Sequence, residues 1–264
     1  RGLGDVYKRQ AADGSVTVED DGRGIPTGMH PEEHAPVLEI VFTRLHAGGK
    51  FAKADGSGPY TFAGGLHGVG VSVTNALSKH LVVTVWRDGQ EATMGFRDGF
   101  VSEPLEIKKS SRPKSRTGTR VTVWPDPKYF DSPVIPEPAL VRLLRSKAVL
   151  LPGCEVDYVN KMTGTEAHWK YSGGLKEYLL SEIKGDSLIE PFEASGFAGE
   201  DSESFSPGEG ASWVVVWTTE GPLTRESYVN LIPTPQGGTH EAGLKDGLFQ
   251  AVRAFMDAHG LQPK

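Results

Sequence analysis

The chain has 264 residues and a net charge of −6, with 38% hydrophobic and 9% aromatic residues. This length suggests one or two globular domains, and no apolar run reaches the roughly 18–20 residues of a membrane span, so we expect no membrane partner. The acidic balance argues against a chain that grips DNA mainly through phosphates, while the single cysteine, Cys154, excludes an internal disulfide and suits a cytoplasmic location.

The first predicted elements are a strand at 15–19, where β-branched residues alternate, and a helix at 36–46, where apolar residues recur every four positions. No apolar period marks residues 1–10. A second helix is expected after the glycine-rich stretch 50–70. Its expected apolar side carries Val69, Val73, Ala76 and Leu77.

The rest of the chain alternates strands and helices. Strands are predicted at 81–86, 91–97, 119–124, 155–160 and 166–171, with helices that end near 150 and 183. After a Gly- and Ser-rich stretch at 185–210 that is typical of a long loop, strands are predicted at 213–218 and 226–232, then an amphipathic helix with Leu244, Leu248, Val252 and Phe255. This order predicts an α/β sandwich of two domains that meet near residues 171–174.

One candidate site is the turn Asp20-Asp21-Gly22-Arg23-Gly24-Ile25-Pro26, which ends the first predicted strand. A carboxylate there can accept a hydrogen bond from an exocyclic amine such as N6 of adenine, and glycines let a base approach the backbone. An ordinary acidic turn explains the short motif equally simply and is favoured when the motif stands alone.

A second candidate is the run Gly64-Gly65-Leu66-His67-Gly68-Val69-Gly70, which leads into a predicted helix. Backbone N–H groups of such a loop bind phosphates well. The spacing matches neither the P-loop nor the dinucleotide fingerprint. A flexible linker is the less favoured alternative, because the glycines adjoin a strong helical pattern.

Two further residues are ambiguous alone. Lys50, in Leu45-His46-Ala47-Gly48-Gly49-Lys50-Phe51, is a phosphate counter-charge or an ordinary exposed lysine. Thr119, in Thr117-Gly118-Thr119, bridges to a base through water or simply begins a strand.

Taken together and in this order, these motifs resemble the GHKL ATPases, a superfamily that includes gyrase B, heat-shock chaperones, mismatch-repair ATPases and sensor histidine kinases. The run from Gly65 to Ser78 and the phrase from Tyr228 to His240 resemble the B subunits of type II DNA topoisomerases. The sequences Phe130-Asp131-Ser132-Pro133 and Lys147-Ala148-Val149-Leu150 favour the topoisomerase IV type, with gyrase B as the alternative. The resemblance extends from about Val16 to the C-terminus.

The resemblance implies an α+β fold: a GHKL (Bergerat) ATPase sandwich over 1–171, followed by a partial ribosomal-S5-domain-2-like transducer domain over 172–264. It implies ATP and Mg²⁺ as cofactors. The implied partners are DNA, the ParC-like A subunit of topoisomerase IV and a second copy of the chain. The implied activity of the whole protein is ATP-driven passage of DNA duplexes, for decatenation, relaxation of supercoils and chromosome segregation.

The resemblance also implies a role for each site residue. Asp20 accepts from the adenine amine, with Thr119 supporting it through a water; Gly24, Ile25 and Pro26 line base and sugar; Arg23 stacks near the pocket mouth. Gly49, Lys50 and Tyr60 belong to a lid over the nucleotide. The phosphates are wrapped by Gly64, Gly65, Leu66, His67, Gly68, Val69, Gly70 and Val71. Arg87 matches an arginine at the pocket edge where aminocoumarins bind in relatives.

Two features of the family pattern are missing from the sequence. The family carries, upstream of the first strand, a glutamate that activates the attacking water and an asparagine that holds magnesium. Residues 1–10 contain neither, with Asp5 as their one carboxylate, and look foreign to the family. No Gln-Thr-Lys loop, whose lysine reaches the γ-phosphate, occurs either. We therefore expect no catalytic residue in this chain and negligible ATP hydrolysis by it alone.

Other interpretations stay open. His30 and His34, four residues apart, suggest a metal site less well than a surface pair at a helix start, and no metal ligand is expected. The basic residues between 108 and 120 touch DNA phosphate or form a solvated loop. A nucleotide-dependent binding module without catalysis is a second functional class. A chaperone or mismatch-repair ATPase is a third, which the run from His67 to Ser78 disfavours.

Overall fold

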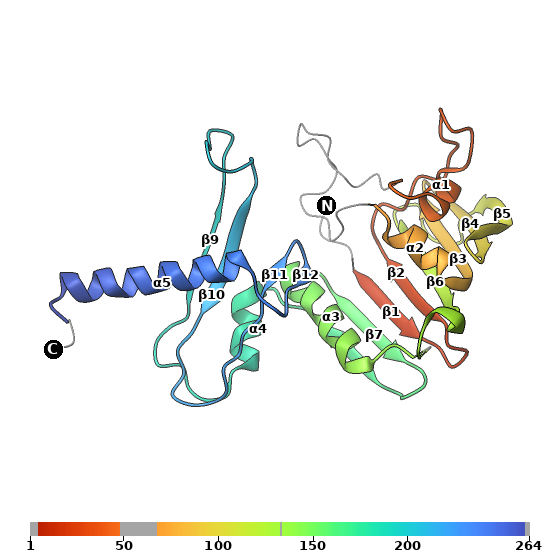
Figure 1. Ribbon diagram of the computed structural model, residues 1–264. Coiled ribbons are helices and arrows are strands. Elements are labelled where there is room, and N and C mark those ends of the chain that lie inside the picture. Colours follow the sequence, from red (N-terminus) through yellow and green to blue (C-terminus); the bar gives the residue numbers. More distant parts are fainter. Residues whose placement is uncertain (1–4, 48–67, 133, 262–264) are drawn as a thin grey trace.

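The structure is a computed structural model that describes residues 5–47, 68–132 and 134–261 (Figure 1). Its largest feature is an eight-stranded sheet of order β5-β4-β3-β6-β2-β1-β7-β8. The strands are β1 (Val6–Gln10), β2 (Val16–Asp20), β3 (Ser78–Arg87), β4 (Gln90–Arg97), β5 (Phe100–Lys109), β6 (Gly118–Pro125), β7 (Val156–Asn160) and β8 (Glu166–Trp169).

The described helices and the smaller strands complete the fold. They are α1 (Val37–Thr43), α2 (Gly70–Ala76), the 3-10 helix η1 (Pro127–Tyr129), α3 (Glu137–Leu150), α4 (Gly174–Glu182), the pair β9 (Phe192–Phe197) and β10 (Gly210–Val215), the pair β11 (Tyr228–Val229) and β12 (Ile232–Pro233), and α5 (Thr239–Ala258). No described helix is both long enough and apolar enough to cross a bilayer.

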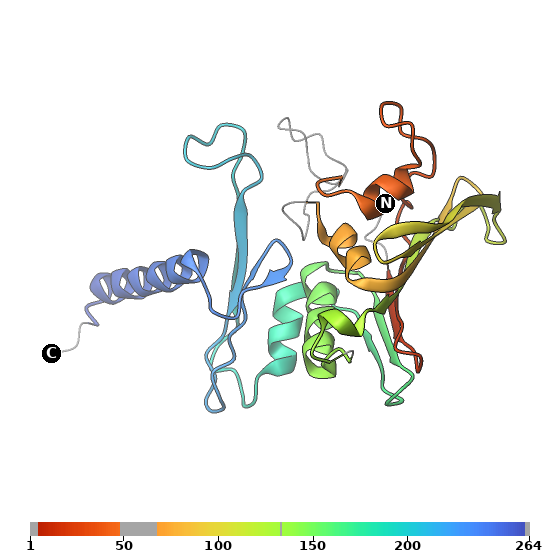
Figure 2. The same ribbon diagram turned by 45° about the vertical axis from the view of Figure 1, so that its right-hand side comes forward.

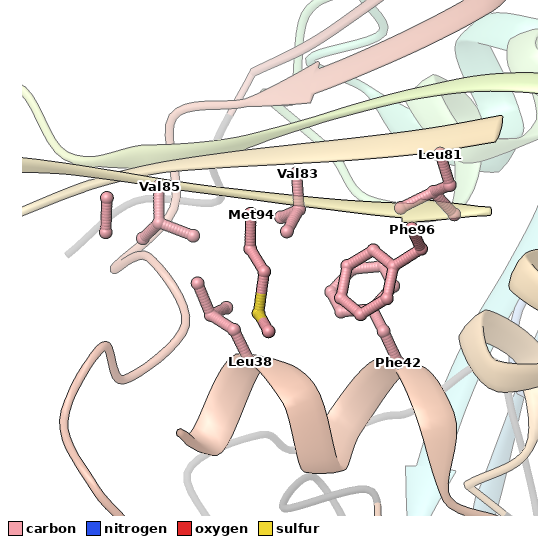
Figure 3. Packing of buried hydrophobic residues seen from close by; sticks show 8 residues of the cluster. Leu38, Phe42, Leu81, Val83, Val85, Met94 and Phe96 are labelled. Carbon is pink, nitrogen blue, oxygen red and sulfur yellow. The ribbon is translucent and has the colours of Figure 1, made fainter. Parts of the chain in front are cut away.

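One core joins α1 to the strands β3 and β4. Side chains of a strand alternate between faces, so alternate residues of β3 and β4 point to the same side as α1. Phe42 of α1 stacks on Phe96 of β4 with ring centroids 5.5 Å apart. Figure 3 shows these residues with Leu38, Leu81, Val83, Val85 and Met94, all buried. This packing fixes α1 against one half of the sheet.

A second core joins α3 to β7 on the same face of the sheet. Leu144 and Val149 of α3 pack with Val156 and Tyr158 of β7. The helix α4 lies beside α3, as both views show, and Tyr178 of α4 packs against this second cluster (Figures 1 and 2). The strands β2 and β1 therefore run between two separately packed halves.

The part of the chain after α4 is less buried. The pair β9–β10 stands apart from the large sheet, and α5 projects away from it in both views (Figures 1 and 2). No residue of α5 is buried, and Phe249, Val252 and Phe255 are each at least half exposed. The amphipathic pattern expected for this helix is present, and the described residues leave its apolar side open.

Several predicted elements are confirmed and others need correction. The strands expected at 81–86, 91–97 and 119–124 are β3, β4 and β6. The stretch expected to be a loop, 185–210, contains β9, and the single strand expected at 226–232 is divided into β11 and β12. The strands β1 and β5 were not expected. In α2 the buried residues are Ser72 and Asn75, whereas Val73, on the side predicted to be apolar, is exposed.

Candidate nucleotide-binding site

The candidate site is centred on Asp20 and Thr119, which the sheet places directly opposite each other. The antiparallel register of β2 and β6 pairs Asp20 with Thr119 and Val18 with Val121. Val121 packs against the first core, so all four side chains point to the helix-bearing face. Thr119 is 7% exposed and Asp20 is half-buried. A carboxylate and a hydroxyl thus lie side by side on one face of the sheet.

Three glycines allow close backbone packing at the turn after β2, and two of them, Gly22 and Gly118, lie against Asp20. A Cβ on Gly118 would lie 2.1 Å from the carbonyl oxygen of Asp20, and one on Gly24 would lie 2.9 Å from that of Trp86. Gly24 also has a φ of +72°, a conformation that favours glycine. The N–H of Gly22 donates to Oδ1 of Asp20 at 2.9 Å, which orients the carboxylate.

Neighbouring side chains hold the turn after β2 in place. The hydroxyl of Thr117 donates to the carbonyl of Gly22 at 2.7 Å, and Nη1 of Arg87 donates to the carbonyl of Gly24 at 2.9 Å. Ile25 packs against the first core. The structure therefore brings Asp20, Gly24 and Ile25 of one turn together with Arg87 and Thr119, which are far from that turn in the sequence.

The helix-bearing face is open beside this pair. Val18 is 40% exposed although it lies on the same face as Val16, which is buried. It lies between the two cores in the order of the strands and belongs to neither of them. A ligand that contacts Asp20 would therefore find apolar surface next to a hydrogen-bonding carboxylate, which is what a purine base requires.

The residues predicted to wrap phosphates are only partly described. Gly68, Val69, Gly70 and Val71 lie at the beginning of α2, beside α1 (Figure 1). The remaining predicted positions, Gly49, Lys50, Tyr60, Gly64, Gly65, Leu66 and His67, lie outside the described residues. Arg23 and Pro26, which are predicted to lie near the base, are exposed in the turn after β2.

Sequence reasoning missed the role of two residues near the site. Gly118 makes the close approach to Asp20, and its signal was the glycine in the centre of Thr-Gly-Thr. Thr117 holds the Gly22 carbonyl. Both follow from the pairing of β2 with β6, which no local pattern reveals.

The opposite face of the same strands is occupied by a salt-bridge cluster. Glu19 accepts from Arg112 at 2.7 Å and from Arg120 at 2.6 Å. Burial acts to raise the pKa of Glu19, but these two hydrogen-bonded guanidinium groups together outweigh burial and hold that pKa below its usual value. The Arg112 guanidinium stacks 3.5 Å from the centroid of Trp86, and Lys108 pairs with Glu91 at 3.2 Å. Three cations of the basic run thus neutralise carboxylates of the sheet, which favours a structural role over DNA contact for them.

His30 and His34 lie in the turns that precede α1, not on a helix. Nδ1 of His30 lies 3.3 Å from the backbone N–H groups of Glu32 and Glu33, so it serves as their acceptor. Among the described residues no group of three His, Cys, Asp or Glu side chains is arranged to hold a metal ion.

Comparison with known proteins places these features in a family. Residues 4–129 match the family described as histidine kinase-, DNA gyrase B-, and HSP90-like ATPase, and residues 174–264 match the DNA gyrase B family. The first match begins before β1 and so includes most of residues 1–10, the segment whose sequence looks foreign to the family. The B subunit of DNA topoisomerase 4 from Escherichia coli K12 is 44% identical over 96% of this chain, whereas the B subunit of DNA gyrase from Thermus thermophilus is 36% identical over 97%. The chain spans 39% of each relative.

Two solved structures share the fold. The 43K ATPase domain of Thermus thermophilus gyrase B, in complex with an aminocoumarin, superposes with a TM-score of 0.77 at 32% identity, covering all of this chain and 65% of that one. The topoisomerase IV ATP-binding domain of Francisella tularensis, in complex with a small-molecule inhibitor, gives 0.69 at 33% identity, covering 99% and 66%. The predicted GHKL fold is therefore confirmed, and the gyrase B alternative is less supported than topoisomerase IV. The chain belongs to the family of type II DNA topoisomerase B subunits.

Proposed function

We propose that this chain binds ATP on the helix-bearing face of its large sheet, with the adenine against β2 and β6. The observation that carries the proposal is the pairing of Asp20 with Thr119 beside the exposed side chain of Val18. The Asp20 carboxylate accepts a hydrogen bond from the adenine amine, and Thr119 supports it through a water. The close backbone contacts of Gly24 and Gly118 hold the turn after β2 against β3 and β6, which keeps the Asp20 carboxylate in place for the base.

The other proposed contacts surround this pair. Gly24, Ile25 and Pro26 line the base and sugar, and Arg23 stacks at the mouth. Arg87 forms the edge of the pocket, where its bond to the Gly24 carbonyl fixes it. The phosphates extend toward Gly68–Val71 at the start of α2. The aminocoumarin complex of the Thermus gyrase B domain supports a second prediction of the same pocket, namely that an aminocoumarin competes with ATP here.

Magnesium is proposed to enter with the nucleotide. Mg²⁺ is commonly held by substrate phosphates and waters, with one or two carboxylates. The described residues offer no cluster that fits an ion held by the protein alone. What the described residues supply is recognition of the base and an orientation for the phosphates.

For the whole protein we propose ATP-driven passage of one DNA duplex through another in the cytoplasm. The proposed partners are DNA, the ParC-like A subunit of topoisomerase IV and a second copy of the chain. The support is the similarity to the B subunit of DNA topoisomerase 4, which is greater than the similarity to that of DNA gyrase. The acidic net charge of −6 agrees with a main DNA grip that lies in other parts of the assembly.

The test replaces each of the two neighbouring carboxylates of β2 in a separate variant. Asp20→Asn replaces an acceptor with an amide whose N–H groups face the adenine amine. We expect the affinity for a non-hydrolysable ATP analogue to fall roughly ten- to hundredfold, as for loss of a hydrogen bond to a charged group. Titration calorimetry measures it. An aminocoumarin should lose affinity in parallel.

The matched control is Glu19→Gln, one residue away on the opposite face. It weakens the pairs with Arg112 and Arg120 and should leave nucleotide affinity within about twofold. Unchanged affinity in Asp20→Asn, or an equal loss in both variants, would show that the base is read elsewhere.

A further inference from the structure

The helix α2 is attached to the molecule in an unusual way. Its buried residues are Ser72 and Asn75, both polar, while Val71 and Val73 are exposed. Most surface helices are held by an apolar stripe facing the core. The neighbouring α1 follows that rule, because it buries Leu38 and Phe42 (Figure 3). The position of α2 therefore depends on hydrogen bonds far more than the position of α1 does.

Asn75 supplies the hydrogen bonds that reach other elements. Its side chain is fully buried. The Nδ2 group donates to the carbonyl of Phe42 at 3.0 Å and to the carbonyl of Gly99 at 3.1 Å. Both hydrogens of the amide are thus used, and burying that amide without partners would be costly. Within the described part of the chain, Oδ1 of Asn75 is buried and has no hydrogen-bond partner.

The two carbonyls are themselves in need of donors. Phe42 lies in the last turn of α1, where carbonyl groups lack partners within the helix. Gly99 lies in the tight turn between β4 and β5 with a φ of +87°, and a Cβ on it would lie 3.3 Å from Cα of Ala76. The turn thus approaches α2 closely at the point where Asn75 binds it. One amide fixes α2 against both a helix and the sheet.

We propose that Asn75 is the positioning residue for the phosphate half of the nucleotide site. It holds α2, and with it Gly68–Val71, at a fixed distance from Asp20 and Thr119. The base half does not depend on it, since the pairing of β2 with β6 holds Asp20 opposite Thr119. This inference rests on the proposed ATP-binding function. Under this proposal Asn75 touches no ligand, and yet it sets how strongly the phosphates bind relative to the base.

The experiment compares two ligands that share a base and differ in phosphates. Adenosine and a non-hydrolysable ATP analogue are titrated calorimetrically into the wild-type chain and into Asn75→Ala. We expect adenosine affinity to change less than about twofold and analogue affinity to fall about tenfold, a difference that corresponds to roughly one lost hydrogen bond. The ratio of the two affinities is the readout, because a general loss of stability lowers both together.

Two further variants keep the test decisive. Leu144→Ala removes a buried side chain from the other core; it should lower the melting temperature and leave the ratio unchanged. If Asn75→Ala does not fold, Asn75→Asp replaces it. The ionised carboxylate has no hydrogen to donate to the Phe42 and Gly99 carbonyls, and the protonated form regains one. The affinity of the analogue relative to adenosine should therefore recover in Asn75→Asp as the pH falls from 8 to 5.5, while this ratio stays level in the wild type.

The outcomes separate this inference from the function on which it rests. A wild-type chain that binds neither ligand overturns the proposed function and this inference with it. A wild-type chain that binds both, together with an Asn75→Ala ratio equal to that of the wild type, overturns the positioning role alone. A ratio that falls in Leu144→Ala as far as in Asn75→Ala also overturns it.

Discussion

At the scale of single residues, β1 carries two polar side chains in buried positions. Lys8 is 8% exposed and lies on the helix-bearing face, between Val18 of β2 and Tyr158 of β7. Burial lowers the pKa of Lys8 to about 8. Gln10 is also buried, and among the described residues its Oε1 has no hydrogen-bond partner. The sequence of this strand is poorly matched to its place in the sheet, which is why no apolar period predicted it.

The shifted pKa of Lys8 predicts a pH-dependent stability. Below pH 8 both states hold the proton and the folded state bears the full cost of the buried charge. Between pH 8 and 10.5 the folded state loses its proton first, so the free energy of unfolding rises with pH, by roughly 3 kcal/mol over the whole interval. Urea denaturation at pH 7 and pH 9.5 should show most of this gain.

The control for this prediction is Lys8→Met, which keeps the length of the side chain and removes the charge. It should be more stable than the wild type at pH 7 and should lose the part of the pH dependence that belongs to Lys8. Equal pH profiles for the two proteins would mean that the ammonium group of Lys8 stays in water.

At the scale of elements, strands with an alternating apolar pattern were predictable, whether central or at the edge like β8, and strands without one, β1 and β5, were not. The strands β3 and β6 are covered on one face, so their alternation is visible in the sequence. The edge strand β5 is exposed along nearly its whole length and has no apolar face to reveal it. The break between β11 and β12 comes from Asn230 and Leu231, both with positive φ, which no residue preference predicted.

The same limit applies to the site. The turn after β2 and the glycine run before α2 were recognisable by motif, but the register that pairs Asp20 with Thr119 is a long-range property of the sheet. Asn75 lay inside a recognised motif, and only its contacts with Phe42 and Gly99 show what it does.

The approach of β6 to β2 predicts a severe effect for Gly118→Ala. The added methyl group would lie 2.1 Å from the Asp20 carbonyl, against rigid backbone, so the two strands must separate locally. We expect a loss of about 3 kcal/mol or more in the free energy of unfolding by urea. Nucleotide affinity should fall with it, because the methyl displaces Asp20 itself.

A matched glycine provides the comparison. Gly28 has open space around the position of an added Cβ and no positive φ. Gly28→Ala should therefore leave the midpoint of denaturation nearly unchanged. A small effect for both substitutions would contradict the close packing of β2 and β6.

At the scale of the whole molecule, α3 connects the large sheet to the elements that follow it. Arg145 of α3 donates to Tyr171 at 2.7 Å and pairs with Glu182 of α4 at 2.6 Å. Lys147 of the same helix donates to the carbonyl of Leu231, in the turn between β11 and β12. Leu231 has a φ of +71°, a conformation that is strained for a branched side chain. The segments 147–150 and 228–240, each of which resembles the family on its own, thus meet in space.

The bond from Lys147 predicts the mobility of that turn. In Lys147→Met the Leu231 carbonyl loses a charged donor, and the strained turn loses its support. Amide hydrogen exchange over residues 228–232 should accelerate about tenfold, as for a loss of roughly 1.4 kcal/mol. Arg142→Gln, on the same helix as Lys147, weakens a longer, partly exposed pair with Glu226 and should change exchange much less.

Relief of the strain offers a second check. Glycine adopts positive φ without cost, so Leu231→Gly should reduce the effect of Lys147→Met on exchange. If the two substitutions act independently, Lys147 holds the hairpin for another reason than the geometry of its turn.

The adjacent carboxylates Glu19 and Asp20 point to opposite faces of β2, one into the salt-bridge cluster and one toward the proposed ligand. A slip of one residue in β2 would exchange them, so a misaligned sheet would lose its salt bridges and its base acceptor together. The binding stoichiometry measured for a nucleotide is then also an assay of folding quality: it counts the fraction of molecules in a preparation whose strands are in register.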